Sequence, residues 1–263
     1  MRVFDFNSAI VRSPGKSVVN GLSATPGPAP VFGTINAEHQ SYITALRAAG
    51  VEVIVLDALE QFPDSIFVED PALVFSQAAI LLRPGAPSRM AEAQELAVTL
   101  AARFPAVLPL SAGFADGGDI LITPSQVLIG LSARTDEAGA CALQGLLESI
   151  GLSSKVVGVP PGTLHLKTDC SLVDEDTVLA TPDLAKSGVL DGFRILVVPT
   201  EERSATNALR VNDVVFMKAG CPRTQDLLVR HGLNVLPLPV SEIAKIDAGL
   251  SCMSLRWFDP LTT

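Results

Sequence analysis

The feature that most constrains the fold of this chain is an internal repeat. Three segments share one ending, in which a helical pattern reaches a glycine and an apolar run follows: residues 48–53, 149–152 and 230–235. Glycine directly after the last helical residue is a frequent helix stop. With two further helices at 88–104 and 182–187, the predicted helices start near residues 39, 88, 135, 182 and 222. This spacing of about 40 to 49 residues is typical of repeat architectures.

Paired apolar runs precede each of the later helices. The pairs are 71–75 with 78–82, 119–122 with 126–131, 164–173 with 177–180, and 208–211 with 214–217. Pro, Asn and Asp between the two runs are typical of β-hairpins. The unit is therefore strand, strand, helix, strand, and one such unit cannot bury its apolar faces alone. The sequence predicts an α/β fold in which five modules close into a ring. The alternative is an ordinary α/β domain with coincidental spacing.

Composition limits the function classes. The chain has 263 residues, of which 48% are apolar and 18% charged, so we expect one folded domain over residues 1–263. A net charge of −9 argues against nucleic acid and anionic membranes as partners, and is compatible with a small cationic substrate. The start of the chain lacks the apolar segment of a secretory signal, and no 18-residue apolar stretch predicts a spanning helix. Four cysteines without metal-like pairing favour a reduced, cytoplasmic protein without a metal.

One segment departs from the repeat. Residues 13–34 hold four prolines among Gly, Ser and Ala, which predicts a long surface loop. Such a loop could serve as a lid that excludes water from a site.

The three histidines have different settings. His39 and His231 are expected at a helix start and a helix end, both facing solvent. His165 lies within 163–167, which alternates like a strand, so either a structural or a catalytic role is open to it. Among the cysteines, Cys141 is expected in a helix core and Cys170 in the strand after His165.

The other two cysteines lie near turns. Cys221 precedes a helix, and Cys252 follows a turn of small residues that could expose its thiol. The alternative for Cys252 is burial in a terminal strand.

Two acidic segments stand in apolar or glycine-rich surroundings. Asp64, Glu69 and Asp70 lie in segment 62–71, where burial would demand a cation, and an extended segment would put Asp64 and Asp70 on one face. Asp116 and Asp119 flank two glycines at a strand start, where the alternative is a solvated turn.

Two arginines occupy matching places in consecutive modules. Arg89 and Arg134 each follow a hairpin at a helix start, so a ring would direct both towards one axis, where they could bind a carboxylate. Acids for a cationic head and arginines for an anionic tail describe an arginine-like substrate. A thiol with a histidine would then act at the guanidinium carbon.

Six motifs together carry a family resemblance: residues 62–70, 83–89, 116–119, 130–135, 164–167 and 251–252. In this order they resemble dimethylarginine dimethylaminohydrolase. The resemblance implies the pentein fold, a five-module α/β propeller, and hydrolysis of asymmetric dimethylarginine or monomethylarginine to citrulline and a methylamine. It implies no cofactor.

The same resemblance implies roles for individual residues. Cys252 would be the nucleophile, His165 the general acid and base, and Asp116 the acid that orients the histidine. The implied substrate-binding residues are Leu22 through its carbonyl, Asp64, Glu69, Asp70, Arg89, Arg134 and the backbone of Ile246. A substrate cation and the imidazole would favour the thiolate of Cys252. Met90 and Ala248 depart from the family pattern and affect expectations about substrate preference.

Two alternatives stay open. An arginine deiminase-like hydrolase would share Cys252, His165 and the acids but prefer an unmethylated head; the absence of an inserted helical domain favours the methylarginine interpretation. A non-catalytic binding module on the same ring would need no nucleophile and would tend to display a basic face, against the net charge of −9. A homodimer is possible on an apolar edge.

Overall fold

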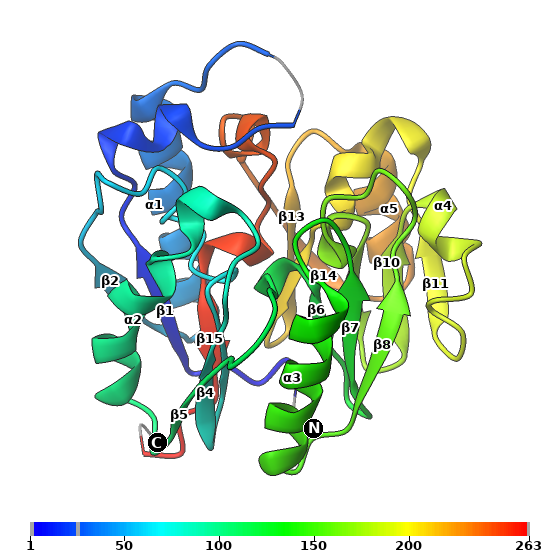
Figure 1. Cartoon of the computed structure of the whole chain (residues 1–263). Helices are drawn as coiled ribbons and strands as arrows, with labels where there is room; N and C mark the ends of the chain where they lie inside the picture. Colours follow the sequence, from blue (N-terminus) through cyan, green and yellow to red (C-terminus); the bar gives the residue numbers. More distant parts are fainter. Residues whose placement is uncertain (1–2, 25–26, 262–263) are drawn as a thin grey trace.

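Five three-stranded sheets form the framework of the computed structural model, which describes residues 3–24 and 27–261 (Figure 1). In sheet order the strands are β15 (Leu255–Trp257), β1 (Ser8–Arg12) and β2 (Glu52–Leu56); β3 (Ala72–Phe75), β4 (Ala78–Leu81) and β5 (Val107–Pro109); β6 (Ile120–Ile122), β7 (Val127–Leu131) and β8 (Ser154–Gly158); β9 (Cys170–Asp174), β10 (Thr177–Ala180) and β11 (Arg194–Val197); β12 (Leu209–Val211), β13 (Val214–Lys218) and β14 (Asn234–Leu238). The helices are α1 (Phe32–Ala48), α2 (Glu92–Ala101), α3 (Glu137–Ser149), α4 (Pro182–Ala185) and α5 (Pro222–Arg230).

Every sheet has the same wiring. Its middle strand pairs antiparallel with the first strand and parallel with the third, and the helix provides the crossover to the parallel strand. The predicted unit of strand, strand, helix and strand is therefore confirmed five times. The first module takes its first strand, β15, from the far end of the chain, so the ring closes between the two ends of the sequence.

Three glycines end helices as the sequence predicts. Gly50, Gly151 and Gly232 have φ values of +87°, +79° and +89°, which residues with a side chain rarely adopt. Each of these glycines ends a helix and turns the chain towards the parallel strand of its module.

The apolar core is divided among the five boundaries between modules. Neighbouring strand residues point to opposite boundaries: Ile10 packs against the second module, whereas Ala9 and Val11 pack with Phe216 of the fifth. Successive modules share one cluster each, and the fifth shares one with the first. This is the closed α/β ring that the repeat predicted.

Three expectations about elements were wrong. Helix α1 begins at Phe32 rather than near residue 39, so His39 lies mid-helix and is completely buried instead of facing solvent. Helix α2 begins only at Glu92, after a 3₁₀ turn. Cys141 is exposed rather than in the core, because α3 directs Leu143 and Leu147 inwards.

The proline-rich segment crosses one end of the molecule, close to the segment around residues 243–247 (Figure 1). It includes a 3₁₀ helix at Lys16–Asn20 and ends at the start of α1, so it is shorter than the predicted 13–34 loop. Pro26 lies outside the described residues. None of the helices described is both long and apolar enough to cross a membrane.

Candidate active site

Two connected cavities meet at Cys252 and His165. The first chamber, of about 160 Å³, is lined by residues that include Asp64, Asp70, Arg89 and Arg134. The second chamber, of about 330 Å³, extends towards Lys167 and Asn207. Both chambers share Ala24, Leu164, His165, Asp247, Ala248 and Cys252. The thiol and the imidazole thus border one space, although they are 87 positions apart in sequence.

Cys252 lies in the 3₁₀ helix Ser251–Met253, just before β15, rather than in a strand. It is half-buried. Burial, and then the carboxylates of Glu69 and Asp70, raise the pKa of its thiol to about 12. The ligand-free protein therefore holds a neutral thiol at pH 7, in the absence of the substrate cation that the sequence expectation included.

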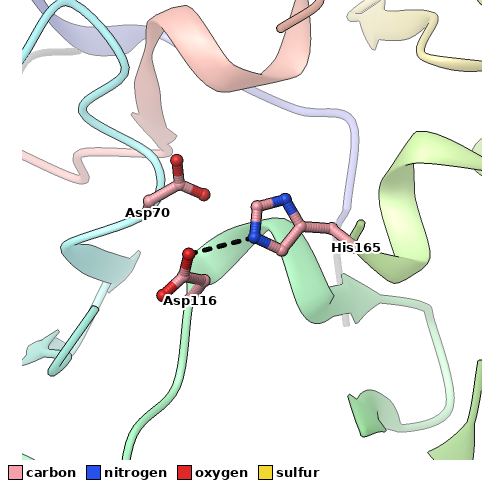
Figure 2. Close-up of side chains that lie close together, drawn as sticks. All are labelled: Asp70, Asp116 and His165. Atoms are coloured by element: carbon pink, nitrogen blue, oxygen red, sulfur yellow. Dashed lines mark hydrogen bonds and ion pairs between the residues drawn. The ribbon is translucent and has the colours of Figure 1, made fainter. Parts of the chain in front are cut away.

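His165 is an extended residue that precedes the 3₁₀ helix Leu166–Thr168, so its placement within a strand was wrong. Its Nε2 lies 3.0 Å from Oδ2 of Asp116 (Figure 2). Burial opposes a charge on the ring, but the hydrogen bond to Asp116 and the carboxylates of Asp70 and Asp119 outweigh it and raise the pKa of His165. Gly118 lies under the ring, where a Cβ would come within 2.6 Å of Nδ1.

Asp116 and Asp119 are both completely buried, which excludes the solvated-turn alternative. Asp116 also accepts from the backbone N–H of Gly85 at 2.7 Å, which fixes its second oxygen. Asp119 accepts from the backbone N–H of Leu166 at 2.9 Å. Asp116 therefore orients the ring of His165, and Asp119 anchors the segment that carries it.

The acids of segment 62–71 are buried, but the segment is a series of turns and not extended. Asp64 accepts from the backbone N–H of Leu22 at 2.9 Å, and burial raises its pKa. Asp70 forms an ion pair with Arg89, and accepts from Gly118 N–H at 3.1 Å. Burial opposes the charge of Asp70, but Arg89 and His165 keep its pKa below the ordinary value.

Glu69 is oriented away from both chambers. Its carboxylate receives Lys167 Nζ at 2.6 Å, the Ser251 hydroxyl at 2.9 Å and Arg256 Nη2 at 3.2 Å. It lines instead a third cavity, of about 360 Å³, together with residues of β3, β6, β9, β12 and β15. The structure therefore does not bring Glu69 to the first chamber with Asp70, because three donors hold it in the wall between the cavities.

Arg89 and Arg134 reach the first chamber from two modules. Arg89 is buried, and its guanidinium is bound by the carboxylates of Glu92 and Asp70 and by two carbonyls. The Arg134 side chain makes no hydrogen bond or ion pair with the described part of the chain. The guanidinium of Arg134 thus has no partner among the described residues, whereas that of Arg89 is occupied by the carboxylates of Asp70 and Glu92.

The remaining candidates border the first chamber from the loops. Leu22 is partly exposed, and Ile246, in the 3₁₀ helix Ile243–Ile246, is buried beside it. The backbone N–H of Ala24 donates to Asp247, so the proline-rich segment is fastened to the rim of the site.

Three residues of the site were not among the sequence candidates: Lys167, Asn207 and Arg256. Only Lys167 carried a signal, because it stands two residues after His165 in the same motif. One carboxylate oxygen each of Asp70 and Asp116 and one ring nitrogen of His165 lie within 4.8 Å of one another, a grouping that could hold a metal. Arg89, Gly118 and Gly85 already occupy the oxygens of the two aspartates, so a metal would have to displace these partners.

Known proteins match this chain over nearly its whole length. A family model described as arginine deiminase matches residues 108–219. The N(G),N(G)-dimethylarginine dimethylaminohydrolase of Pseudomonas aeruginosa is 38% identical over 254 residues, covering 96% of this chain and 100% of that protein. The protein of the same name from Streptomyces coelicolor is 32% identical, covering 94% and 96%.

A solved structure has the same fold at 38% identity. It is the Pseudomonas aeruginosa enzyme as a cysteine-to-serine mutant complexed with citrulline. It matches with a TM-score of 0.93 and covers 96% of this chain and 100% of its own.

Proposed function

This chain belongs to the dimethylarginine dimethylaminohydrolase family, and on that premise we propose that it hydrolyses asymmetric dimethylarginine and monomethylarginine to citrulline and methylamines. The protein is a hydrolase of linear amidines. The observation that carries the proposal is the lining of the first chamber. It combines Cys252, His165 and Asp70 with the guanidinium of Arg134.

The substrate fits this chamber by charge. Its guanidinium lies next to Asp70, where the carboxylate compensates the cation and fixes the plane of the group. Its carboxylate binds Arg134, and its α-amino group lies between Asp64 and the carbonyl of Leu22. Arg89 supports Asp64 and Asp70, and Ile246 contributes backbone contacts. Glu69 does not contact the substrate, and its carboxylate holds Lys167 and Ser251 behind the wall of the site.

The high pKa of the free thiol gives the substrate a direct part in activation. A guanidinium next to Cys252 offsets the carboxylates that disfavour the thiolate, so the thiol loses its proton to solvent when the substrate is bound. The sulfur then forms a bond to the guanidinium carbon. The His165 imidazolium protonates the methylated nitrogen, and the C–N bond breaks to release the amine.

Hydrolysis of the resulting thiouronium uses the same histidine. Neutral His165 takes a proton from water while the water oxygen bonds to the carbon, and Asp116 stabilises the returning imidazolium. Collapse of the adduct breaks the C–S bond, the hydroxyl of the adduct loses its proton to solvent, and citrulline and the cysteine thiolate remain.

The direct test is citrulline release from asymmetric dimethylarginine, monomethylarginine and arginine, measured separately. We expect release from the two methylated substrates and a loss of at least about 10³-fold in Cys252→Ser, since the serine hydroxyl is a far weaker nucleophile. Cys141→Ser is the matched control, because Cys141 is exposed on α3 and should leave the rate unchanged. Full activity of Cys252→Ser would reject the mechanism.

The same assay decides the alternative activity. The match of residues 108–219 to the arginine deiminase model favours arginine itself as the competing substrate. Citrulline from arginine alone would replace the proposed function with that of a deiminase.

We further propose a cellular compartment and an oligomeric state. Four free cysteines favour the reducing cytoplasm as the place of action. The outer strands β2, β11 and β14 expose Val55, Val197 and Leu236, which supports a homodimer through a sheet edge. Sedimentation equilibrium of the purified protein measures the latter.

A further inference from the structure

Asn207 connects the two segments that carry Cys252 and His165. It directly follows the 3₁₀ helix Thr200–Thr206 of the fifth module, and its side chain reaches the wall of the second chamber. Its amide Nδ2 donates to the Lys167 carbonyl at 3.2 Å and to the Ser251 hydroxyl oxygen at 3.2 Å. Its Oδ1 accepts from the backbone N–H of Ser251 at 3.0 Å. One side chain therefore fixes both the histidine segment and the nucleophile segment.

These contacts determine which way the amide of Asn207 faces. The backbone N–H of Ser251 needs an acceptor, so Oδ1 must point to it and Nδ2 must point to the other side. The Ser251 hydroxyl gives its single hydrogen to Glu69 at 2.9 Å, so its oxygen accepts from Asn207. The Asn207 amide is thus the last link of a chain of hydrogen bonds that begins at Lys167 and Glu69.

The sulfur of Cys252 is the third acceptor beside Nδ2, at 4.0 Å. Two N–H groups face three acceptors, so at least one N–H is shared, and the sulfur, as the most distant acceptor, competes with the Lys167 carbonyl and the Ser251 oxygen for it. A neutral thiol attracts this donor weakly. A thiolate attracts it strongly, because hydrogen bonds to charged acceptors are shorter and about twice as strong.

Packing makes the placement of Asn207 specific. A Cβ at Gly249 would come within 2.4 Å of the Asn207 side chain, so only glycine allows the nucleophile loop to lie against the amide. This close approach and the four hydrogen-bond contacts leave the Asn207 side chain no alternative position without disrupting the loop.

We propose that Asn207 is a positioning residue for the reaction, which aligns the nucleophile segment with the histidine segment and donates its amide N–H to the Cys252 thiolate. The proposal rests on the proposed function, in which that thiolate is the nucleophile. None of the sequence motifs included Asn207.

The experiment compares Asn207→Ala and Asn207→Asp with the exposed control Asn234→Ala on β14. Asn207→Asp keeps the shape and the acceptor for Ser251 N–H, but replaces the donor near the sulfur by a carboxylate oxygen. We measure kcat and KM, the melting temperature, and the rate at which iodoacetamide alkylates Cys252 at pH 9, with the exposed Cys141 as the internal reference.

We expect Asn207→Ala to lower kcat by about 10- to 100-fold with KM changed less than about three-fold, since the lost contact is strongest with the charged sulfur. Alkylation of Cys252 should slow by about five-fold or more in Asn207→Ala and further in Asn207→Asp, whose carboxylate disfavours the thiolate. Cys141 should react at the wild-type rate, and Asn234→Ala should match the wild type in every readout.

Two results would overturn the proposal. One is wild-type kcat and alkylation in both folded Asn207 variants. The other is a loss of activity in proportion to the loss of folded protein, with unchanged alkylation of what remains folded, because a purely structural residue would behave so. Absence of citrulline release by the wild type would overturn the proposed function instead, and the alkylation rates would still test Asn207.

Discussion

At the scale of single residues, His39 shows that the tertiary structure can bury a histidine that the sequence predicts to face solvent. It lies in the middle of α1 with no exposed area, and its two ring nitrogens have no hydrogen-bond partner within the described structure. Burial lowers the pKa of His39 to about 4. The helix tolerates this histidine only as a neutral, nearly apolar side chain.

This burial predicts a loss of stability in acid. Between pH 6.5 and 4 the unfolded chain binds a proton at His39 that the folded protein does not, so the free energy of unfolding falls with decreasing pH. For a difference of two to three pKa units the contribution is about 3 kcal/mol. In His39→Leu we expect that part of the decline to vanish. Urea unfolding at pH 7 and pH 4.5 measures it, and equal declines in both proteins would contradict the burial.

His165 is shifted in the opposite direction, because Asp116 and two further carboxylates surround it. Its titration, followed by NMR of the imidazole, should have a midpoint above 6.5, whereas His39 should not titrate until about pH 4. Asp116→Asn removes the charge beside the ring and should lower the midpoint of His165. Asp226→Asn on α5 is an exposed control. An unmoved midpoint would show that Asp116 does not set the charge of the ring.

At the scale of elements, the proline-rich segment is held by carboxylates at several points. Backbone N–H groups of the segment donate to Glu60 at Lys16 and Ser17, to Asp64 at Leu22, to Asp247 at Ala24 and to Glu242 at Val31. These side chains belong to different parts of the ring, so the segment can be released at one point while the others hold. We expect any movement of the lid to be confined to Leu22 and Ala24, which line the first chamber.

The Asp247 contact offers a test of the lid. Asp247 has φ +54°, which glycine adopts without strain, so Asp247→Gly removes the carboxylate and keeps the backbone. Loss of this charge-assisted hydrogen bond should raise KM by about five- to ten-fold and leave kcat nearly unchanged. Hydrogen exchange at Leu22 and Ala24 should become faster. Unchanged exchange with a raised KM would assign the effect to Asp247 itself rather than to the lid.

At the scale of the whole molecule, the ring depends on β15. This strand pairs with β1 and places Leu255 and Trp257 in the boundary to the second module, where Trp257 packs on Phe104 at 5.0 Å between ring centres. Near the two ends of the described chain, Asn7 and Asp259 exchange hydrogen bonds. The ring is thus closed by noncovalent contacts alone.

Truncation after Ser254 should therefore prevent folding, because losing two large buried side chains and one edge of the first sheet costs about 5 kcal/mol, as much as many domains possess. A circular permutant should fold and stay active when a linker joins the old ends and new ends are placed between the exposed Ser187 and Gly188. Circular dichroism and citrulline release measure both variants. An inactive, unfolded permutant would show that the order of the modules matters beyond their contacts.

Much of the architecture was predictable because its signals are local. Gly50, Gly151 and Gly232 end helices through their own backbone freedom, and the hairpin turns need only a few adjacent residues. The start of α1 was not predictable in the same way. The backbone N–H of Val31, which directly precedes the helix, donates to Glu242, 211 residues away.

The functional site shows the same difference between local and long-range signals. The repeat, the candidate thiol and imidazole, and the acids and arginines near them could be found from short stretches of sequence, because each is a residue type in a local motif. Three features depend on the folded ring: Glu69 forms an ion pair with Lys167, Arg89 is occupied while Arg134 has no partner among the described residues, and Asn207 reaches the sulfur. Closing the ring brings loops of different modules to one axis, and the partner of a buried polar group is chosen by that closure rather than by its neighbours in the chain.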